Sequence, residues 1–199
     1  MEPCFVKETG LNNMRNWSKM DAVYTEYIKT QSPGSGAPNG GRDVMRACDR
    51  FMPIIEAGIL GRRVVDVGCG EAFMSKYFEE RGWDYVGFDL YERTDPTVIK
   101  GDYHFDDIEP RELLLTSQSL EHSMFPLYSV SRLASFVVPG GYLIINIPEC
   151  PSLSDCHGHY CVMPDAEWNL IFGDVGLKIL DLYHGMYGTC NQSEYLLQK

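Results

Sequence analysis

The segment VVDVGCGEAF at residues 64–73 constrains the fold more than any other part of the chain. A short β-branched run ends at Val67, Gly68 and Gly70 follow, and a helical pattern opens at Glu71. Glycine allows positive φ angles and a close approach between the main chain and a ligand. The segment therefore predicts a buried strand that turns through a glycine loop into a helix, with main-chain N–H groups aimed at whatever binds there.

Apolar runs and helical patterns alternate along the rest of the chain. The expected strands are 63–67, 85–90, 98–102, 112–117, 141–147, 177–182 and 194–198, and the expected helices are 71–81, 126–136 and 165–172, with another helical pattern from Asp43. This alternation indicates an α/β fold with a largely parallel sheet covered on both faces. The segments 91–97 and 103–111 are too short for full crossover helices, so we expect irregular crossovers there.

The glycine turn lacks the features of common phosphate-binding loops. A Gly-x-Gly-x-x-Gly turn would place its last glycine at Phe73, and no Gly-Lys-Ser/Thr follows. An NAD-dependent oxidoreductase is therefore only an alternative. Asp89 ends the next strand 19 positions after Gly70 (89 − 70 = 19), the spacing at which a carboxylate accepts both ribose hydroxyls. Together with Asp66, placed for a cationic group, this suits a nucleoside with an ammonium group and no phosphates, such as S-adenosylmethionine.

Five segments in order resemble the motifs of the class I S-adenosylmethionine-dependent methyltransferase family, in its small-molecule, type 11/12-like branch. They are VVDVGCGEA (64–72), YVGFDL (85–90), GDYHF (101–105), LLLTSQSLEH (113–122) and VVPGGYLIINIPE (137–149). The resemblance covers about residues 60–199. It implies a Rossmann-like, doubly wound and mostly parallel seven-stranded sheet with helices on both faces and an antiparallel last strand.

The resemblance also implies roles for individual side chains. The residues expected to hold S-adenosylmethionine, and S-adenosylhomocysteine as its product, are Asp66, Gly68, Cys69, Gly70, Asp89, Leu90, Asp102, Tyr103, Ser117 and Gln118. His122 is the catalytic candidate, as a general base, and a structural role in packing the next helix is the alternative. We expect His104 to face solvent.

Two departures from the family pattern bear on function. Ala72 stands where the family has a third glycine, and we expect this small residue to pack and cofactor binding to survive. The fourth strand ends in Thr-Ser-Gln-Ser, unlike the Asn/Asp-Pro-Pro-Tyr of enzymes that methylate bases. In agreement, 17 Lys and Arg against 28 Asp and Glu give a net charge of −11, which repels nucleic acid. We expect a small-molecule or sugar-like acceptor and neither a nucleic-acid nor a membrane partner; a non-catalytic binding module remains the alternative.

The segment CPSLSDCHGHYC at residues 150–161 gathers residue types that bind soft metals. They are Cys150, Cys156, His157, His159 and Cys161. Their spacing is irregular and contains no Cys-x-x-Cys pair, so we assign no metal and interpret the segment as an acceptor-side loop. Metal binding, or contact between one of the two histidines and the acceptor, stays open.

The chain divides into two parts in this interpretation. Residues 1–57 form an N-terminal helical extension with the Gly/Pro-rich loop QSPGSGAPNGGR (31–42), and residues 58–199 form the methyltransferase domain. The extension is either a lid over the site or a solvated tail. Seven cysteines, an odd number, favour a reducing compartment, and the N-terminus has no apolar signal-peptide core. We therefore expect a cytoplasmic protein; its oligomeric state is open.

Overall fold

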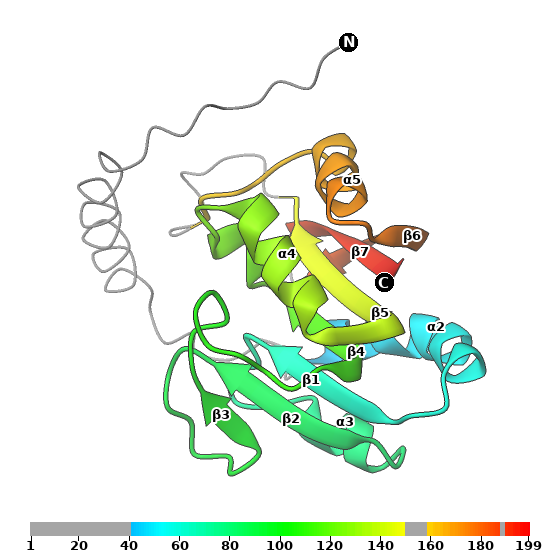
Figure 1. The fold of residues 1–199 in the computed structure, drawn as a ribbon, viewed down its shortest axis with the longest axis vertical. Helices are drawn as coiled ribbons and strands as arrows, with labels where there is room; N and C mark the ends of the chain where they lie inside the picture. Colours follow the sequence, from blue (N-terminus) through cyan, green and yellow to red (C-terminus); the bar gives the residue numbers. More distant parts are fainter. Residues whose placement is uncertain (1–40, 150–158, 188–189) are drawn as a thin grey trace. The chain divides into compact units, whose positions relative to one another are not determined.

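A computed structural model describes residues 41–149, 159–187 and 190–199 (Figure 1). The elements are α2 (Arg42–Gly58), β1 (Arg63–Val67), α3 (Ser75–Glu79), β2 (Asp84–Asp89), β3 (Val98–Lys100), β4 (Arg111–Ser117), the 3₁₀ turn η1 (Leu120–His122), α4 (Pro126–Ser135), β5 (Val137–Pro148), α5 (Asp165–Asp174), β6 (Lys178–Tyr187) and β7 (Cys190–Gln198). The predicted lid falls largely on residues 1–40, outside the described residues. Among the helices described, none has the length and apolar character that crossing a membrane requires.

The strands form one seven-stranded sheet in the order β3-β2-β1-β4-β5-β7-β6. The neighbours from β3 to β5 pair in parallel, whereas β7 runs antiparallel to both β5 and β6. The predicted doubly wound sheet with an antiparallel last strand is confirmed. After β1 the chain adds β2 and β3 on one side, and from β4 onward it adds the later strands on the other side. The direction in which strands are added therefore reverses between β1 and β4.

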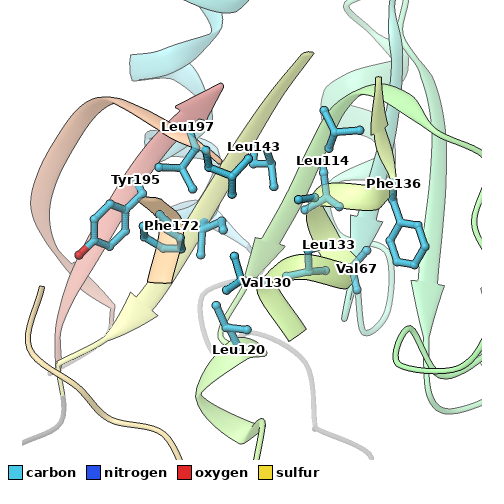
Figure 2. Packing of buried hydrophobic residues seen from close by; sticks show 14 of the residues in the cluster. Val67, Leu114, Leu120, Val130, Leu133, Phe136, Leu143, Phe172, Tyr195 and Leu197 are labelled. Atoms are coloured by element: carbon cyan, nitrogen blue, oxygen red, sulfur yellow. The ribbon is translucent and has the colours of Figure 1, made fainter. Parts of the chain in front are cut away.

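Helices cover both faces of the sheet, as predicted. Along the central strands, side chains alternate between two apolar clusters. Val64, Leu113 and Leu115 pack with α2 and α3. On the other face, α4 and α5 pack against residues such as Leu114 and Leu143 (Figure 2). Because these strands are buried on both faces, each residue points into one apolar cluster or the other. The strand segments are therefore almost wholly apolar.

The regions between strands are shorter and more irregular than complete crossover helices. Turns and bends without a helix connect β2 to β3 and β3 to β4, as the short segments predicted. The helix expected at 71–81 is reduced to α3, because Ala72 has a φ of 55°, outside the right-handed helical region. The turn after β1 therefore continues for several residues before the helix begins.

The expectation that His104 faces solvent is wrong. Its side chain is buried, with Nδ1 2.9 Å from Asp102 Oδ1 and Nε2 2.8 Å from Ser129 Oγ. The rings of Tyr103 and Tyr128 stack on the imidazole. A lone histidine in the sequence gave no sign of these partners, which tie the β3–β4 connection to α4.

The packing of α5 gives a test of the fold. Phe172 is fully buried between elements, with its ring 5.0 Å from that of Tyr195 on β7, whereas Leu170 on the same helix is 69% exposed. We expect Phe172→Ala to lower the free energy of unfolding by about 3–5 kcal/mol. Leu170→Ala should change it by less than about 0.5 kcal/mol. Urea denaturation followed by circular dichroism measures both, and equal losses would contradict this packing.

Candidate functional site

The candidate site lies where the carboxyl ends of β1, β2 and β4 meet at one edge of the sheet. Val67 at the end of β1 is in register with Phe88 on β2 and with Thr116 on β4. In open α/β sheets, ligands bind outside this edge, at the point where the strand order reverses. The residues that follow these three strands are therefore brought together, as the sequence predicted for most of the cofactor-binding set.

Two glycines of the turn after β1 have different tasks. Gly68 and Gly70 both have positive φ, at 75° and 55°. A Cβ on Gly68 would lie 2.6 Å from Ser119 Oγ, so this position has no room for a side chain. Among the residues that the structure describes, none has an atom within 4 Å of a Cβ placed on Gly70. Gly68 is thus required by packing within the protein, whereas Gly70 borders open space that a ligand can fill.

Asp89 connects the turn to the end of β2. One carboxylate oxygen accepts the Gly70 N–H at 2.9 Å. The other accepts the Tyr91 N–H at 2.9 Å and the guanidinium of Arg93, whose Nη2 lies at 3.1 Å. The side chain of Arg93 is only 7% exposed and pairs with Glu71 at 3.0 Å. Sequence analysis missed Arg93, because it lies in an irregular segment outside every recognised motif.

Asp66 is buried on β1, one residue before the strand ends. Its carboxylate accepts a hydrogen bond from the Tyr85 hydroxyl at 2.9 Å. Burial raises the pKa of Asp66 to about 7; the Tyr85 hydrogen bond opposes this shift, and the negative charge of Asp89 adds to it. Asp66 therefore holds a proton far more readily than an exposed carboxyl, and a cation beside it would find a poorly solvated partner.

Three more residues predicted to hold the cofactor lie in the turn after β1 and beyond the end of β2. Cys69 is buried, and burial together with the charge of Asp66 raises the pKa of its thiol, so it remains protonated. Leu90 is half-buried directly after β2. The Gly101 N–H donates to Asp89 O at 2.8 Å and places the next residues beside the end of β2. There Asp102 is engaged by His104.

Tyr103, another residue predicted to hold the cofactor, packs partly buried against the apolar cluster of α4 and α5. Burial raises the pKa of its hydroxyl, which keeps it neutral. Its ring stacks on His104 with the centroids 4.1 Å apart. Contacts within the protein therefore hold the Tyr103 side chain in place without a ligand.

A buried polar network joins the ends of β4, β5 and β7. Gln118 adopts a φ of 53°, and its side-chain amide donates to Gln192 Oε1 at 3.1 Å. Ser117 Oγ lies 3.4 Å from the amide nitrogen of Asn146 on β5. Gln192 in turn donates to Glu194 at 2.7 Å. Sequence analysis missed Gln192 and Glu194, because nothing in the β7 segment marked polar residues as buried.

Glu121, His122 and His159 form a cluster just beyond β4. Each histidine has its Nε2 atom 3.8 Å from Glu121 Oε1, and the two rings are 4.9 Å apart at 82°. Glu121 is fully buried, which raises its pKa to about 8. Burial, followed by the proximity of His122, lowers the pKa of His159. The catalytic candidate His122 is thus brought together with two residues to which the sequence gave no joint role.

The remaining residues of the 150–161 segment are only partly described. Cys161 is buried, and burial, with Glu121 and Glu167 nearby, raises the pKa of its thiol to about 11. Cys150, Cys156 and His157 lie outside the described residues. Of the two possible ligands that the structure describes, His159 lies in a cluster with other metal-binding groups and Cys161 does not.

The sheet order, the glycine turn and the paired carboxylates define an α/β protein of the class I methyltransferase fold. Residues 38–182 match the family model described as Methyltransferase domain, and the chain belongs to this family. The resemblance noted in the sequence is confirmed.

Comparisons with individual proteins agree on the fold. The chain is 28% identical over 106 residues to a ubiquinone biosynthesis O-methyltransferase of Aromatoleum aromaticum; the match spans 45% of this chain and 45% of that protein. Among solved structures, 1,6-didemethyltoxoflavin-N1-methyltransferase of Burkholderia thailandensis superposes with a TM-score of 0.63 at 18% identity, covering 99% of this chain and 93% of that one. Magnesium protoporphyrin IX methyltransferase of Synechocystis PCC 6803 gives a TM-score of 0.66 at 14% identity, with coverages of 92% and 94%.

The two glycines give a matched test of the turn. Gly68→Ala should lower the free energy of unfolding by about 2–5 kcal/mol, since left-handed strain adds to the overlap with Ser119. Gly70→Ala should cost only about 1–2 kcal/mol, because strain acts alone. Chemical denaturation measures both. A second change, Ser119→Gly, should recover part of the Gly68→Ala loss and none of the Gly70→Ala loss.

The buried carboxyl of Asp66 predicts a pH dependence of stability. Its folded-state pKa of about 7 exceeds its ordinary value of 3.8, so between these values the folded chain binds more protons than the unfolded chain. The stability contributed by that proton is present below about pH 4 and is lost as the pH rises through about 7. Asp66→Asn keeps an oxygen that accepts the Tyr85 hydroxyl but removes the titration. Urea denaturation at a series of pH values measures this effect. The free energy of unfolding of the variant should rise relative to that of the wild type by about 1.4 kcal/mol per pH unit between about pH 4 and pH 7. A difference that stays constant with pH would contradict the raised pKa.

Proposed function

We propose that the chain is an S-adenosylmethionine-dependent methyltransferase that acts on a small-molecule or sugar-like acceptor. The observation that carries the proposal is the open space beside Gly70, bordered by the ends of strands that carry the buried carboxylates Asp66 and Asp89. Family membership and the named O-methyltransferase relative support the activity. The two solved structures compared above hold S-adenosylhomocysteine, which supports the cofactor. The chain spans less than half of the curated relative, so the activity of that whole protein is not carried over.

The residues present fit this cofactor. Asp89 Oδ2 accepts one hydrogen bond from the protein, which leaves acceptor capacity for a ribose hydroxyl. Asp66, whose carboxylate accepts the Tyr85 hydroxyl through one oxygen, suits the ammonium group of the methionine part. Leu90, Asp102 and Tyr103 are assigned to the adenine side. The bound cofactor supplies a methyl group activated by a sulfonium charge, so the chain has chiefly to align the acceptor with it.

The cofactor's other border is assigned to residues that follow β1 and β4. Gly68 and Cys69 shape the turn, and Ser117 and Gln118 line the β4 end. The hydrogen bond from Gln118 to the buried Gln192 fixes the Gln118 side chain from behind. With its side chain held in this way, Gln118 would present its amide group to a ligand in one defined orientation.

His122 is assigned to the acceptor side of the site. Its side chain is 32% exposed, whereas Glu121 beside it is 1% exposed, so His122 is the member of this cluster that a bound molecule reaches most easily. Methylation of a hydroxyl requires that its O–H bond be broken. A role in that step, by direct contact with the acceptor, is the catalytic function proposed for His122.

A non-catalytic binding module that keeps the methyltransferase fold is the second candidate. Arg93 already occupies one oxygen of Asp89, and His104 already occupies Asp102. Both contacts use part of the acceptor capacity on which the ribose and adenine assignments depend. Product formation with a panel of acceptors separates the enzyme from the module, and cofactor binding alone does not.

Calorimetric titration with S-adenosylhomocysteine tests the assignment. We expect micromolar binding and no binding of NAD⁺. Asp89→Asn should weaken the affinity by about 10- to 100-fold, because a charged acceptor of ribose hydroxyls is lost. Asp84→Asn is the matched control. Asp84 begins the same strand and pairs with Arg111, at the end of the strands opposite to the candidate site. This variant should bind with the affinity of the wild type. Equal affinities for wild type and Asp89→Asn would remove the ribose assignment.

A further inference from the structure

The cluster of Glu121, His122 and His159 contains a buried carboxylate that the protein does not satisfy. Glu121 is 0% exposed, and in the described part of the chain neither of its carboxylate oxygens has a hydrogen-bond partner from another residue. The Nδ1 atom of His159 is buried without a partner among the same residues. Because burying a polar group without a hydrogen-bond partner costs several kcal/mol, such a group normally has a partner, and a bound metal ion is one that the two histidines beside it could share.

The positions of the two histidines fit a shared cation better than hydrogen bonds to Glu121. Both Nε2 atoms lie 3.8 Å from the same carboxylate oxygen, too far for a hydrogen bond. Ligand atoms about 2.1 Å from a tetrahedral metal lie roughly 3.4 Å from one another. One potential ligand atom from each of the three residues lies within 4.8 Å of the others. A small inward movement would therefore complete the three contacts.

The protein backbone holds the two parts of the cluster together. The main-chain N–H groups of Tyr160 and Cys161 both donate to Glu121 O, each at 2.9 Å. These bonds fix the segment that carries His159 against η1, which carries the other two side chains. The cluster is thus assembled by main-chain contacts that do not depend on a metal.

A second cluster with the same residue types shows what a satisfied arrangement looks like. Glu149, Asp165 and His184 also have potential ligand atoms within 4.8 Å of one another. There, however, His184 Nδ1 lies 2.9 Å from Glu149, and the Ser193 hydroxyl lies within hydrogen-bond distance of both carboxylates, at 2.8 and 2.7 Å. His184 is 58% exposed. This cluster needs no cation, and it supplies a control.

We infer that Glu121, His122 and His159 bind one divalent transition-metal ion of the zinc class. Two imidazoles and one carboxylate are the donors that Zn²⁺ and Co²⁺ accept, whereas Mg²⁺ and Ca²⁺ prefer oxygen ligands. Three protein ligands leave a position for water or an exchangeable ligand, on the side where His122 reaches solvent. This inference replaces the role proposed for His122 above: as a metal ligand, His122 would not itself contact the acceptor.

Metal titration of the whole chain tests the inference without any assay of methyl transfer. Protein stripped with a chelator should bind one equivalent of Zn²⁺ with micromolar or tighter affinity. Glu121→Gln and His159→Asn should each weaken that binding by at least about tenfold. His184→Asn should leave the tight equivalent in place. Zinc should also raise the melting temperature of the wild type and have little effect on the two ligand variants.

Spectra of the Co²⁺-substituted protein identify the donors. We expect visible bands of a cobalt ion with nitrogen and oxygen ligands and no thiolate-to-cobalt charge-transfer band. A thiolate band, tight zinc binding that survives in both ligand variants, or no zinc binding at all would overturn the inference. Glu121→Gln replaces the buried carboxyl with an amide of the same shape, so the metal-free variant should have a melting temperature no lower than that of the metal-free wild type. His159→Asn changes a partly exposed position and is an independent test of metal binding. These outcomes hold whether or not S-adenosylhomocysteine binds, so failure here is distinct from failure of the proposed function.

Discussion

The hydrogen bond from the Gly70 N–H to Asp89 is the contact on which the site depends. It joins the turn after β1 to the end of β2, two points 19 residues apart in the chain, at a distance of 2.9 Å. The Gly68 N–H adds a second link across the same strands, to Phe88 O. With the turn held from both sides, Gly70 can face open space while Gly68 packs on Ser119. The open surface beside Gly70 is therefore a product of β1–β2 pairing and not of the glycine turn alone.

The sequence predicted the sheet well because strands buried on both faces have a simple signature. Continuous apolar runs such as Leu113–Leu115 place alternate residues in opposite clusters, so that every residue of the run is buried. The ends of elements were less predictable. The α3 helix starts late because of the left-handed backbone at Ala72, a conformation that a non-glycine residue does not announce in the sequence.

The polar part of the site was harder to predict than the glycine turn. Gly70 and Asp89 are linked through a local βαβ unit with a characteristic spacing, so their proximity follows from short-range pattern. Arg93 lies only four residues after Asp89, but in an irregular segment that follows no such pattern. Gln192 lies 74 positions from its partner Gln118, and His104 was placed wrongly because its partner Ser129 lies 25 positions away. Pairings of this kind depend on tertiary packing, which a single sequence does not encode in any local period.

The position of β7 between β5 and β6 has a consequence for how the chain acquires its structure during synthesis. Among the strands that the structure describes, β6 pairs only with β7, which follows it in the chain. As the polypeptide leaves the ribosome, β1 to β5 can assemble while β6 has no partner. The edge of β5 also stays unpaired until β7 emerges. The part of the sheet that carries the glycine turn can thus form early, and an unpaired edge on β5 must be protected from other chains until translation has passed residue 198.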